Sequence, residues 1–252
     1  MRLSVMWPEW LTDWIDKIVN QIELNFIKDD RYLYILRGLG VTLLITFFAV
    51  LLGIALGVVC AIVRSTHDKL NREMRPGFGK FVLGFVNKIV ELYLTVIRGT
   101  PVVVQLMIAY FIIFASSKNK VLVAVLAFGI NSGAYVAEIV RSGIMSIDNG
   151  QFEAGRSLGF NYVQTMAYII VPQAFKNVLP ALANEFIVLL KETSVSGYIG
   201  VEDMTKGGDI IRSRTYSPLM PLLAVAMIYL IIVIFFSRLV SLLERRLRNS
   251  DR

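Results

Sequence analysis

The stretch from Glu153 to Pro172 reads E-A-G-R-S-L-G-F-N-Y-V-Q-T-M-A-Y-I-I-V-P, and it decides how the rest of the chain is interpreted. It lies between two strongly apolar segments and is polar enough itself to lie in water. The stretch is too long for a tight turn and too regularly patterned for a flexible linker. We therefore expect a structured segment outside the membrane that another molecule recognises.

The composition places the chain in a membrane. Of its 252 residues, 56% are hydrophobic and only 18% are charged, against about 25% in an average globular domain. The mean hydropathy is +0.62. The single cysteine, Cys60, excludes an internal disulfide, and the single histidine, His67, leaves no Cys/His cluster for a structural metal. We predict an all-α integral membrane protein without a metal site.

Five apolar segments predict five membrane spans. Residues 38–63 carry no charge, so they can cross a hydrocarbon core of about 30 Å as a helix. The second span is expected as one long helix, because a separate crossing before Pro101 would bury three charged residues. The five predicted spans are 38–63, about 84–115, 121–137, about 169–190 and about 219–240. On the first span, small residues recur every fourth position and favour close approach of a neighbouring helix: Ala49, Gly53, Gly57 and Ala61.

Charge sets the predicted topology. The loop at 64–80 and the tail that begins near Arg238 each carry a net charge of +3, and Lys and Arg accumulate in cytoplasmic loops. With five spans, this places the N-terminus outside, the C-terminus inside and residues 153–168 in the cytoplasm. The formal net charge of +7 is thereby explained without nucleic acid as a partner. Residues 191–218 are predicted to be a polar connection on the outer side.

The N-terminal segment, residues 1–35, is predicted to lie on the membrane surface. It contains all three tryptophans, and apolar residues continue at helical spacing while acidic residues fill other positions. The chain thus divides into this segment, a transmembrane domain at 36–240 and a basic cytoplasmic tail at 241–252. A linker with incidental tryptophans is the alternative for the first part.

Two short stretches of the sequence partly match catalytic motifs. Gly155 to Gly159 matches G-x-S-x-G, the nucleophile elbow of serine hydrolases, but no histidine lies downstream of Ser157 to serve as a base. Gly79-Lys80 is followed by Phe81, whereas a phosphate-binding loop requires Ser or Thr there. We therefore predict no catalytic residue and no ATP hydrolysis by this chain, which suits either a permease with a separate ATPase or a secondary transporter.

The stretch from Glu153 to Pro172 resembles the signature of the integral-membrane permease subunits of ABC importers. The resemblance rests on Glu153-Ala154, on Gly159 six residues after the glutamate, and on Ile169 and Pro172. The family prefers Ala at position 155 and Leu at position 171. Further stretches are similar to the polar amino-acid uptake branch of this family: 98–101, 104–106, 131–135 with Glu138 and Arg141, 184–186, 191–194 and 213–215.

This resemblance implies partners and a location. It implies a second permease subunit, identical or different, around a shared translocation path, and an ATPase dimer that holds the ATP and Mg²⁺. It also implies an extracytoplasmic amino-acid-binding protein and the lipid bilayer of a bacterial inner membrane, which the chain crosses several times. The cytoplasmic loop at 149–171 would dock on the ATPase through a short coupling helix, with the expected coupling residues Glu153, Ala154, Arg156, Gly159 and Pro172.

Each of three coupling residues also has a local physical role in this expectation. Glu153 is expected near a helix start, where the helix dipole favours a carboxylate. Gly159 supplies a turn that other residues would strain. Pro172 stiffens the entry to the fourth span.

The substrate is expected near mid-membrane. Asn131 lies roughly 15 Å into the third span from outside, and Glu185 roughly 20 Å into the fourth from inside. A carboxylate at that depth costs about 2.5 to 3.5 kcal/mol unless it is paired or solvated, and an amino acid's ammonium group would stabilise it. The expected substrate residues are Asn131, Ser132, Tyr135, Asn184, Glu185 and, from the resembling stretch at 191–194, Glu192.

Other interpretations remain open for these charged residues. Glu185 could form an internal pair with Lys191 or a polar contact between helices, or it could carry an ion or proton in a secondary amino-acid transporter. Glu138 and Arg141 lie three residues apart on one helix face, and we predict that they form a structural pair.

Overall fold

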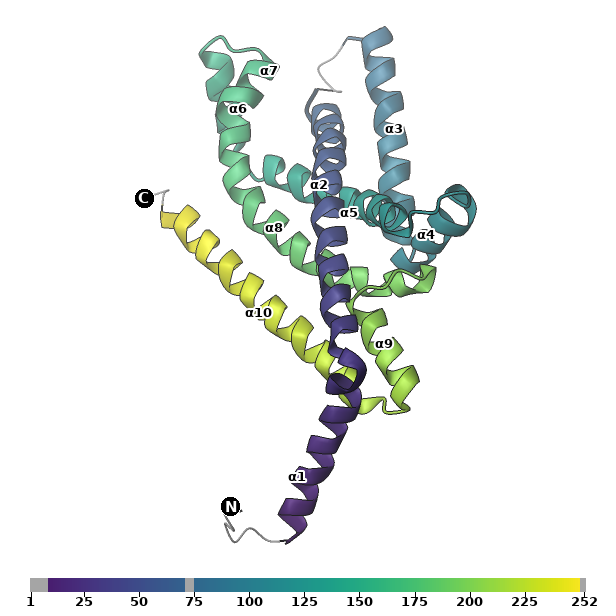
Figure 1. Ribbon diagram of the computed structural model, residues 1–252. Helices are drawn as coiled ribbons and strands as arrows, with labels where there is room; N and C mark the ends of the chain where they lie inside the picture. The colour runs from purple at the N-terminus through teal and green to yellow at the C-terminus, as the bar shows by residue number, and fades with distance from the viewer. Residues whose placement is uncertain (1–8, 71–74, 250–252) are drawn as a thin grey trace.

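The computed structural model describes residues 9–70 and 75–249, and every regular element within these ranges is a helix (Figure 1). The predicted all-α fold is therefore confirmed for the described residues. The elements in chain order are α1 (Glu9–Ile22), η1 (Glu23–Ile27), η2 (Lys28–Asp30), α2 (Tyr32–Leu70), α3 (Phe78–Gly99), α4 (Val102–Ile108), η3 (Ala109–Ile113), α5 (Lys120–Met145), α6 (Asn149–Ser157), α7 (Tyr162–Thr165), η4 (Met166–Ile170), α8 (Val171–Glu192), η5 (Thr193–Ile199), α9 (Met204–Thr215) and α10 (Leu219–Asn249).

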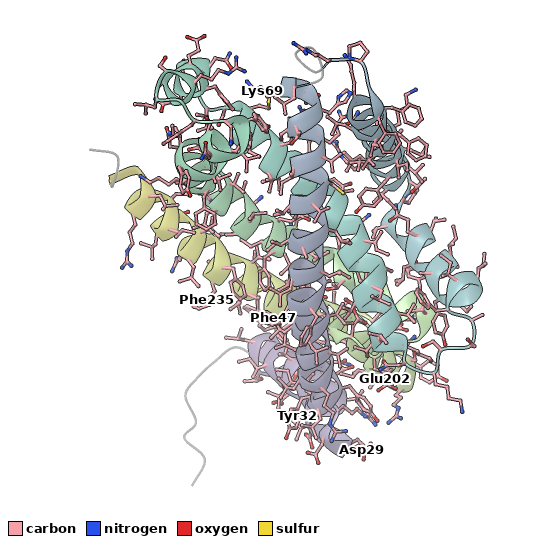
Figure 2. The ribbon with its side chains drawn as sticks, turned by 90° about the horizontal axis from the view of Figure 1, so that it is seen from above. Asp29, Tyr32, Phe47, Lys69, Glu202 and Phe235 are labelled. Atoms are coloured by element: carbon pink, nitrogen blue, oxygen red, sulfur yellow. The ribbon has the colours of Figure 1, made fainter. Side chains whose placement is uncertain are left out.

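Helix α2 is the central element, and its longest packing contact is with α5 (Figures 1 and 2). The predicted stripe of small residues forms this contact. A Cβ atom on Gly53 would lie 2.9 Å from the Ser132 side chain, and one on Gly57 would lie 2.5 Å from Val136. The glycines thus allow the two helices to approach closely. Around this contact, a core cluster includes Ile45, Ala49, Leu106, Phe128 and Leu189.

Within the described residues, three helices are long and apolar enough to span a membrane by themselves: α2, α5 and α10. Helix α3 and the segment that begins at Val102 together make a fourth candidate, but they meet at an angle of 110°. Helix α8 carries too many polar residues to count as a span on hydropathy.

The expectation of one long second helix is wrong, because the chain breaks at Thr100 and Pro101. Proline has no N–H to continue the helix and pushes the preceding residue toward an extended conformation. Thr100 accordingly has φ −122° and ψ 147°. The Gln105 side-chain amide donates to the carbonyl oxygens of Ile97 at 2.7 Å and of Thr100 at 3.1 Å, so it stabilises the end of α3.

Three predicted boundaries also differ. Helix α2 continues to Leu70, so it occupies part of the loop predicted at 64–80. The fourth helix begins well before residue 169, because α7, η4 and α8 follow one another without a break from Tyr162. The connection predicted at 191–218 is largely helical. Hydropathy marks where a helix can lie in lipid, whereas the backbone hydrogen bonds continue past that limit.

Helix α1 has a strongly amphipathic sequence and leaves Trp10 and Trp14 exposed. Trp7 lies outside the described residues. The fully buried Asn25 joins this segment to residues almost 200 positions later in the chain. The Thr215 hydroxyl donates to Asn25 Oδ1 at 2.8 Å, and Asn25 Nδ2 donates to Ser217 Oγ at 3.3 Å. These bonds attach the N-terminal segment to the turn between α9 and α10.

Candidate functional site

The stretch from Glu153 to Pro172 lies in a helical hairpin formed by α6 and α7. This hairpin is on the same side of the molecule as the C-terminal end of α2 and the start of α3 (Figure 1). Asp148 caps α6, since its side chain accepts from the backbone N–H of Gly150 at 2.6 Å. Gly159 adopts φ +80° directly after the helix, as the turn expected there requires. Asn161 and Gln164 form a reciprocal capping box that starts α7.

One local expectation for this loop is wrong. Glu153 lies in the second turn of α6, not near its start, because Asp148 begins the helix five residues earlier. Pro172 lies in the first turn of α8, at the entry to the fourth span as expected, although α7 and η4 precede it without a break. The wide turn of η4, a π-helix over Met166–Ile170, accommodates a proline that cannot donate a backbone hydrogen bond.

Helix α6 is fixed by contacts to two other helices. From the end of α2, Lys69 Nζ donates to Asn149 Oδ1 at 2.7 Å and lies 4.3 Å from the centre of the Phe152 ring. From α8, the Gln173 amide donates to Gln151 at 3.3 Å. Side-chain contacts therefore join α6 to both α2 and α8.

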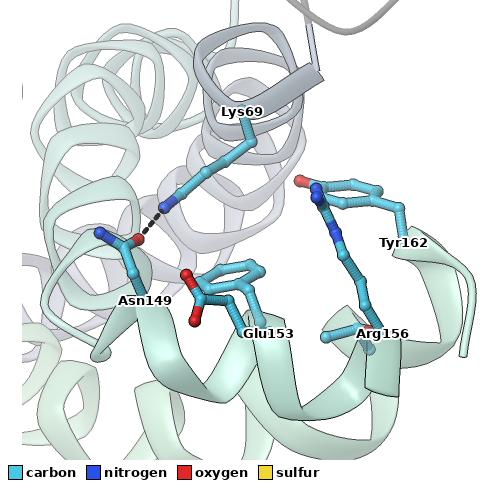
Figure 3. Close-up of a pocket in the computed structure, with 7 residues that line it drawn as sticks. Lys69, Asn149, Glu153, Arg156 and Tyr162 are labelled. Carbon is cyan, nitrogen blue, oxygen red and sulfur yellow. Dashed lines mark hydrogen bonds between the residues drawn. The ribbon is translucent and has the colours of Figure 1, made fainter. Parts of the chain in front are cut away.

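The face of α6 toward α2 borders a hollow of about 280 Å³ (Figure 3). Figure 3 shows the Lys69 to Asn149 hydrogen bond at one side and Arg156 extended toward Tyr162 at the other. Glu153, Ala154 and Arg156 are exposed, so all three are accessible to another molecule. Buried Gly155 is different: a Cβ there would lie 2.7 Å from the Thr165 side chain, so glycine permits α6 to pack on α7.

The structural context of a nucleophile elbow is absent at Ser157. Its hydroxyl donates to the Glu153 backbone oxygen of the same helix at 3.0 Å, and no strand precedes it in the part of the chain that the structure describes. A nucleophilic serine requires a strand, a sharp turn and a base. The hydrolase interpretation is therefore not supported.

A second group of predicted residues meets between α5 and α8. The Ser132 hydroxyl donates to Glu185 Oε1 at 2.8 Å, and Asn131 Nδ2 donates to Gln105 Oε1 at 3.0 Å. Asn131, Ser132 and Glu185 are all buried. We call these residues together with Gln105 the polar centre. The structure thus brings two of the six expected substrate residues, Ser132 and Glu185, into contact, and a third, Asn131, next to Ser132 in the chain, contacts Gln105 of α4.

The polar centre contains unmet interactions. Glu185 is 8% exposed and forms no ion pair with any residue in the described ranges, so the alternative pairing with Lys191 is not formed there. Asn131 Oδ1 is buried and has no hydrogen-bond partner among the described residues. Asn131 Oδ1 therefore still requires a donor, whereas Glu185 has a hydrogen bond from Ser132 but no cationic partner among the described residues.

The remaining expected substrate residues lie elsewhere. Asn184 is exposed and Glu192 is half-buried. Tyr135 opens on a separate hollow of about 540 Å³. Arg98 also lines this hollow, with its guanidinium 5.8 Å from the centre of the Tyr135 ring.

The predicted pair of Glu138 and Arg141 is confirmed, with Arg141 Nη2 and Glu138 Oε1 2.8 Å apart. It belongs to a larger network, since Arg141 also lies 3.2 Å from Asp68 Oδ2, and Arg98 lies 3.8 Å from Glu138 Oε2. These ion pairs connect α2, α3 and α5. The sequence did not single out Asp68, because its partner is 73 residues away.

Sequence reasoning also missed Gln105 and Lys69. Gln105 lies in the stretch 104–106, which is similar to the importer family. Its position four residues after Pro101 could have indicated that its side chain bonds to the carbonyl groups at the end of the preceding helix. Lys69 was counted only as part of a basic loop. Its role depends on the extension of α2 to Leu70, which hydropathy did not indicate.

Helices long and apolar enough to span a membrane, a polar centre between α5 and α8 and an exposed helical hairpin at one end suit a membrane transport subunit. A family model described as "Binding-protein-dependent transport system inner membrane component" matches residues 78–249. The chain belongs to this family.

Two relatives with curated names agree. The arginine transport system permease protein ArtQ of Bacillus subtilis (strain 168) is 36% identical over 221 residues, which cover 86% of this chain and 94% of that protein. The glutamine transport system permease protein GlnP of Escherichia coli (strain K12) is 34% identical over 218 residues, which cover 85% and 93%. The relatives are named as permeases, so the prediction of a transport subunit is confirmed.

Solved structures agree in fold. A chain from a crystal structure of an amino acid ABC transporter with histidines has a TM-score of 0.76, shares 40% sequence identity and covers 88% of this chain and 98% of its own length. An inward-facing structure of the MetNI methionine ABC transporter has a TM-score of 0.73 at 18% identity and shows the common fold alone.

Proposed function

We propose that this chain is the transmembrane permease subunit of an ATP-driven importer for polar amino acids, including basic ones. Arginine and glutamine systems among the relatives support this substrate class. The observation that carries the proposal is the polar centre. A buried carboxylate, Glu185, without a cationic partner among the described residues is complementary to the ammonium group of an amino acid or to a basic side chain.

In this proposal, Asn131 Oδ1 accepts from the substrate and Ser132 holds the Glu185 carboxylate in place. Tyr135 and Arg98 line a neighbouring chamber whose volume, about 540 Å³, suits a small molecule. Asn184 is exposed, Glu192 is half-buried two turns after Glu185 on α8, and their role in binding stays a prediction.

We further propose five spans, with α3 and the segment from Val102 as a broken second span and α8 as the fourth, polar span. The N-terminus is then outside and the C-terminus inside, in the inner membrane of a bacterium. Helix α1 lies at the outer membrane surface, where its two described tryptophans favour the interface. The stretch 149–171 faces the cytoplasm.

Helix α6 is the proposed coupling helix, and the exposed side chains of Glu153, Ala154 and Arg156 contact a separate ATPase dimer that binds ATP and Mg²⁺. The contacts from Lys69 and Gln173 support this role, because a docked helix must be held rigidly to transmit motion. An extracytoplasmic binding protein delivers the amino acid, and a second permease subunit, identical or different, completes the path.

The test is uptake of radiolabelled arginine into proteoliposomes that hold the permease, its ATPase and the binding protein. We expect uptake to require ATP hydrolysis and to fall at least tenfold in Glu153→Lys, because charge reversal disrupts docking. Ser157→Ala, on the same exposed helix, is the matched control and should retain uptake. Full uptake by Glu153→Lys would remove α6 from the coupling surface, and uptake with an inactive ATPase would favour a secondary transporter.

A further inference from the structure

The chamber that Tyr135 and Arg98 line is a hollow of about 540 Å³, and we call it the inner hollow. Four charged side chains line it, two cationic and two anionic, and they come from α2, α3 and α5. Charged side chains within membrane spans face protein or water and avoid lipid, so we place the inner hollow on the interior side of the proposed spans. Its lining includes Arg64, Glu91, Arg98, Gly99, Tyr135 and Glu138.

The inner hollow continues from the polar centre along one face of α5. Asn131, Tyr135 and Glu138 follow one another at spacings of four and three residues, so they share that face. Glu138 lies about 10 Å beyond Asn131 toward the C-terminal end of α5, which is the cytoplasmic end in the proposed orientation. Gln105, which contacts Asn131, also donates to Thr100 Oγ1 at 2.7 Å, directly after the turn of α3 that lines the hollow. An amino acid that moves inward from the polar centre along α5 therefore enters the inner hollow.

The ion pairs inside the inner hollow are loose. Arg98 Nη1 is 3.8 Å from Glu138 Oε2, and Arg64 Nη1 is 3.5 Å from Glu91 Oε1. Charge-assisted hydrogen bonds are shorter, at about 2.7 to 2.9 Å. Arg141, which lies outside the lining, holds the other oxygen of Glu138 at 2.8 Å. Glu138 is thus fixed in place by Arg141, while its Oε2 remains available to a donor at hydrogen-bond distance.

The charges of the inner hollow favour a ligand that carries both signs. Two guanidinium groups and two carboxylates balance one another, so a lone anion bound to an arginine would leave a glutamate without its partner, and a lone cation would do the reverse. An enclosed charge without a partner is costly. The carboxylate and the ammonium group of an amino acid supply one partner for each sign. The inner hollow is also within the size range of pockets that enclose a small molecule.

We propose that the inner hollow is a second binding site for the transported amino acid, which occupies it after it leaves the polar centre and before it reaches the cytoplasm. The substrate carboxylate binds the Arg98 guanidinium, and the substrate ammonium group binds Glu138 Oε2. The amino acid thereby separates the 3.8 Å pair, which forms again on release. Because that pair must open first, the inner hollow binds more weakly than the polar centre. The contacts involve only the groups common to all amino acids, so neutral polar and basic substrates both fit.

This second site rests on the proposed function, because the ligand is the transported amino acid. It is tested by equilibrium dialysis of the purified permease with its ATPase, in the absence of the binding protein, whose own site would add to the count. The probes are radiolabelled arginine and glutamine, and the competitor is agmatine, which is arginine without its carboxylate. We expect two arginine sites per chain that differ at least tenfold in affinity. Agmatine should compete at the tighter site alone.

Two variants in the inner hollow should remove the weaker site and leave the tighter one. Arg98→Gln removes the guanidinium that binds the carboxylate. Gly99→Leu fills the hollow without a change of charge, and a Cβ at Gly99 would meet nothing within 4 Å, so the fold accommodates it. The matched controls are Arg245→Gln, which removes an exposed charge on α10, and Gly40→Leu, which adds a side chain in open space on α2.

Both controls should keep two sites, and Glu185→Gln should lose the tighter site and keep the weaker one. A single arginine site in the unchanged chain, or two sites that persist in Gly99→Leu, would overturn the second site and leave the proposed function standing. Agmatine bound at both sites would also overturn it, because the carboxylate would then play no part. No binding of arginine or glutamine would contradict both proposals. Circular dichroism and the elution volume of each variant establish that it is folded.

Discussion

Glu185 carries the chemistry of the polar centre at the scale of a single residue. Its carboxylate accepts one hydrogen bond, from Ser132 at 2.8 Å, and is otherwise enclosed between α5 and α8. A charged group in such a position is costly without a partner. A transported cation supplies that partner transiently, whereas a permanent ion pair would close the site.

We expect Glu185→Gln to reduce uptake of arginine at least tenfold while uptake of glutamine falls less. The amide keeps the acceptor oxygen for Ser132 and the side-chain shape, but it removes the charge. Competition uptake with the two labelled amino acids in the reconstituted importer measures the ratio. An unchanged ratio would exclude Glu185 from the substrate site.

Asp203 is a second buried carboxyl group, and it lies outside the proposed spans, directly before α9. Burial raises the pKa of its carboxyl to about 6, against an ordinary value of about 4, although its Oδ1 accepts from the Lys206 backbone N–H at 2.9 Å. Because the folded state holds the proton more tightly than the unfolded state, this group stabilises the fold most below pH 4. That contribution is lost as the pH rises through about 6.

Asp203→Asn should therefore unfold at a higher temperature than the unchanged chain at pH 8, by the equivalent of about 1 to 3 kcal/mol, with no difference near pH 4. Asparagine keeps the capping oxygen, and its amide can donate to the buried hydroxyl of Ser196 beside it. Tryptophan fluorescence in detergent follows the unfolding at both pH values.

Asp209, which lies within α9, provides the control for this pH dependence. Its hydrogen bonds with Lys206 and Arg212 lower the pKa of its carboxyl, so its contribution is present above the ordinary pKa and is lost as the pH falls. Asp209→Asn should consequently destabilise the chain at pH 8. If Asp203→Asn gave the same shift at both pH values, the charge of Asp203 would not be the cause.

At the scale of the elements, the glycines of α2 set how closely α5 can pack. A Cβ on Gly57 would meet both the Val136 side chain and the backbone nitrogen of Ala137, 2.8 Å away, so side-chain rotation cannot relieve the clash. Gly40 lies on the same helix, and a Cβ there would meet nothing within 4 Å. Identical substitutions at the two positions therefore have opposite consequences.

Gly57→Ala should lower the stability of the chain by about 1 to 3 kcal/mol, because the α2 and α5 backbones must separate. Gly40→Ala should raise stability slightly, by up to about 1 kcal/mol, through better helix propensity. Unfolding titrations in mixed micelles compare the two. Equal effects would mean that the contact between α2 and α5 does not limit the packing.

At the scale of the whole molecule, one helical path joins the two sites. Helices α7, η4 and α8 follow one another from Tyr162 to Glu192, so the hairpin and the polar centre lie on the same rod. The distance along it from Tyr162 to Glu185 is about 35 Å. The hairpin and Glu185 are therefore joined by continuous helix, without an intervening loop.

Much of this architecture was predictable. Uncharged runs located α2, α5 and α10, because a membrane core requires about 20 apolar residues in succession. The motif between Glu153 and Pro172 indicated where the hairpin lies. Gly159 has a positive φ, as its expected role in a turn requires. The polar centre was partly predictable, since Ser132 contacts Glu185 and Asn131 is buried next to Ser132, but Tyr135 opens on another hollow and Gln105 was not anticipated.

The amino-acid sequence by itself determined the membrane class, the apolar helices and the family, because these depend on local composition and on motifs that are contiguous in the chain. Only the tertiary structure decided the 110° break at Pro101, the continuous rod through Pro172 and the pairing of Ser132 with Glu185. The break itself follows from Pro101 and its neighbours, but its angle, the course of the helix through Pro172 and the Ser132–Glu185 contact depend on packing between residues far apart in the chain, which no local pattern records.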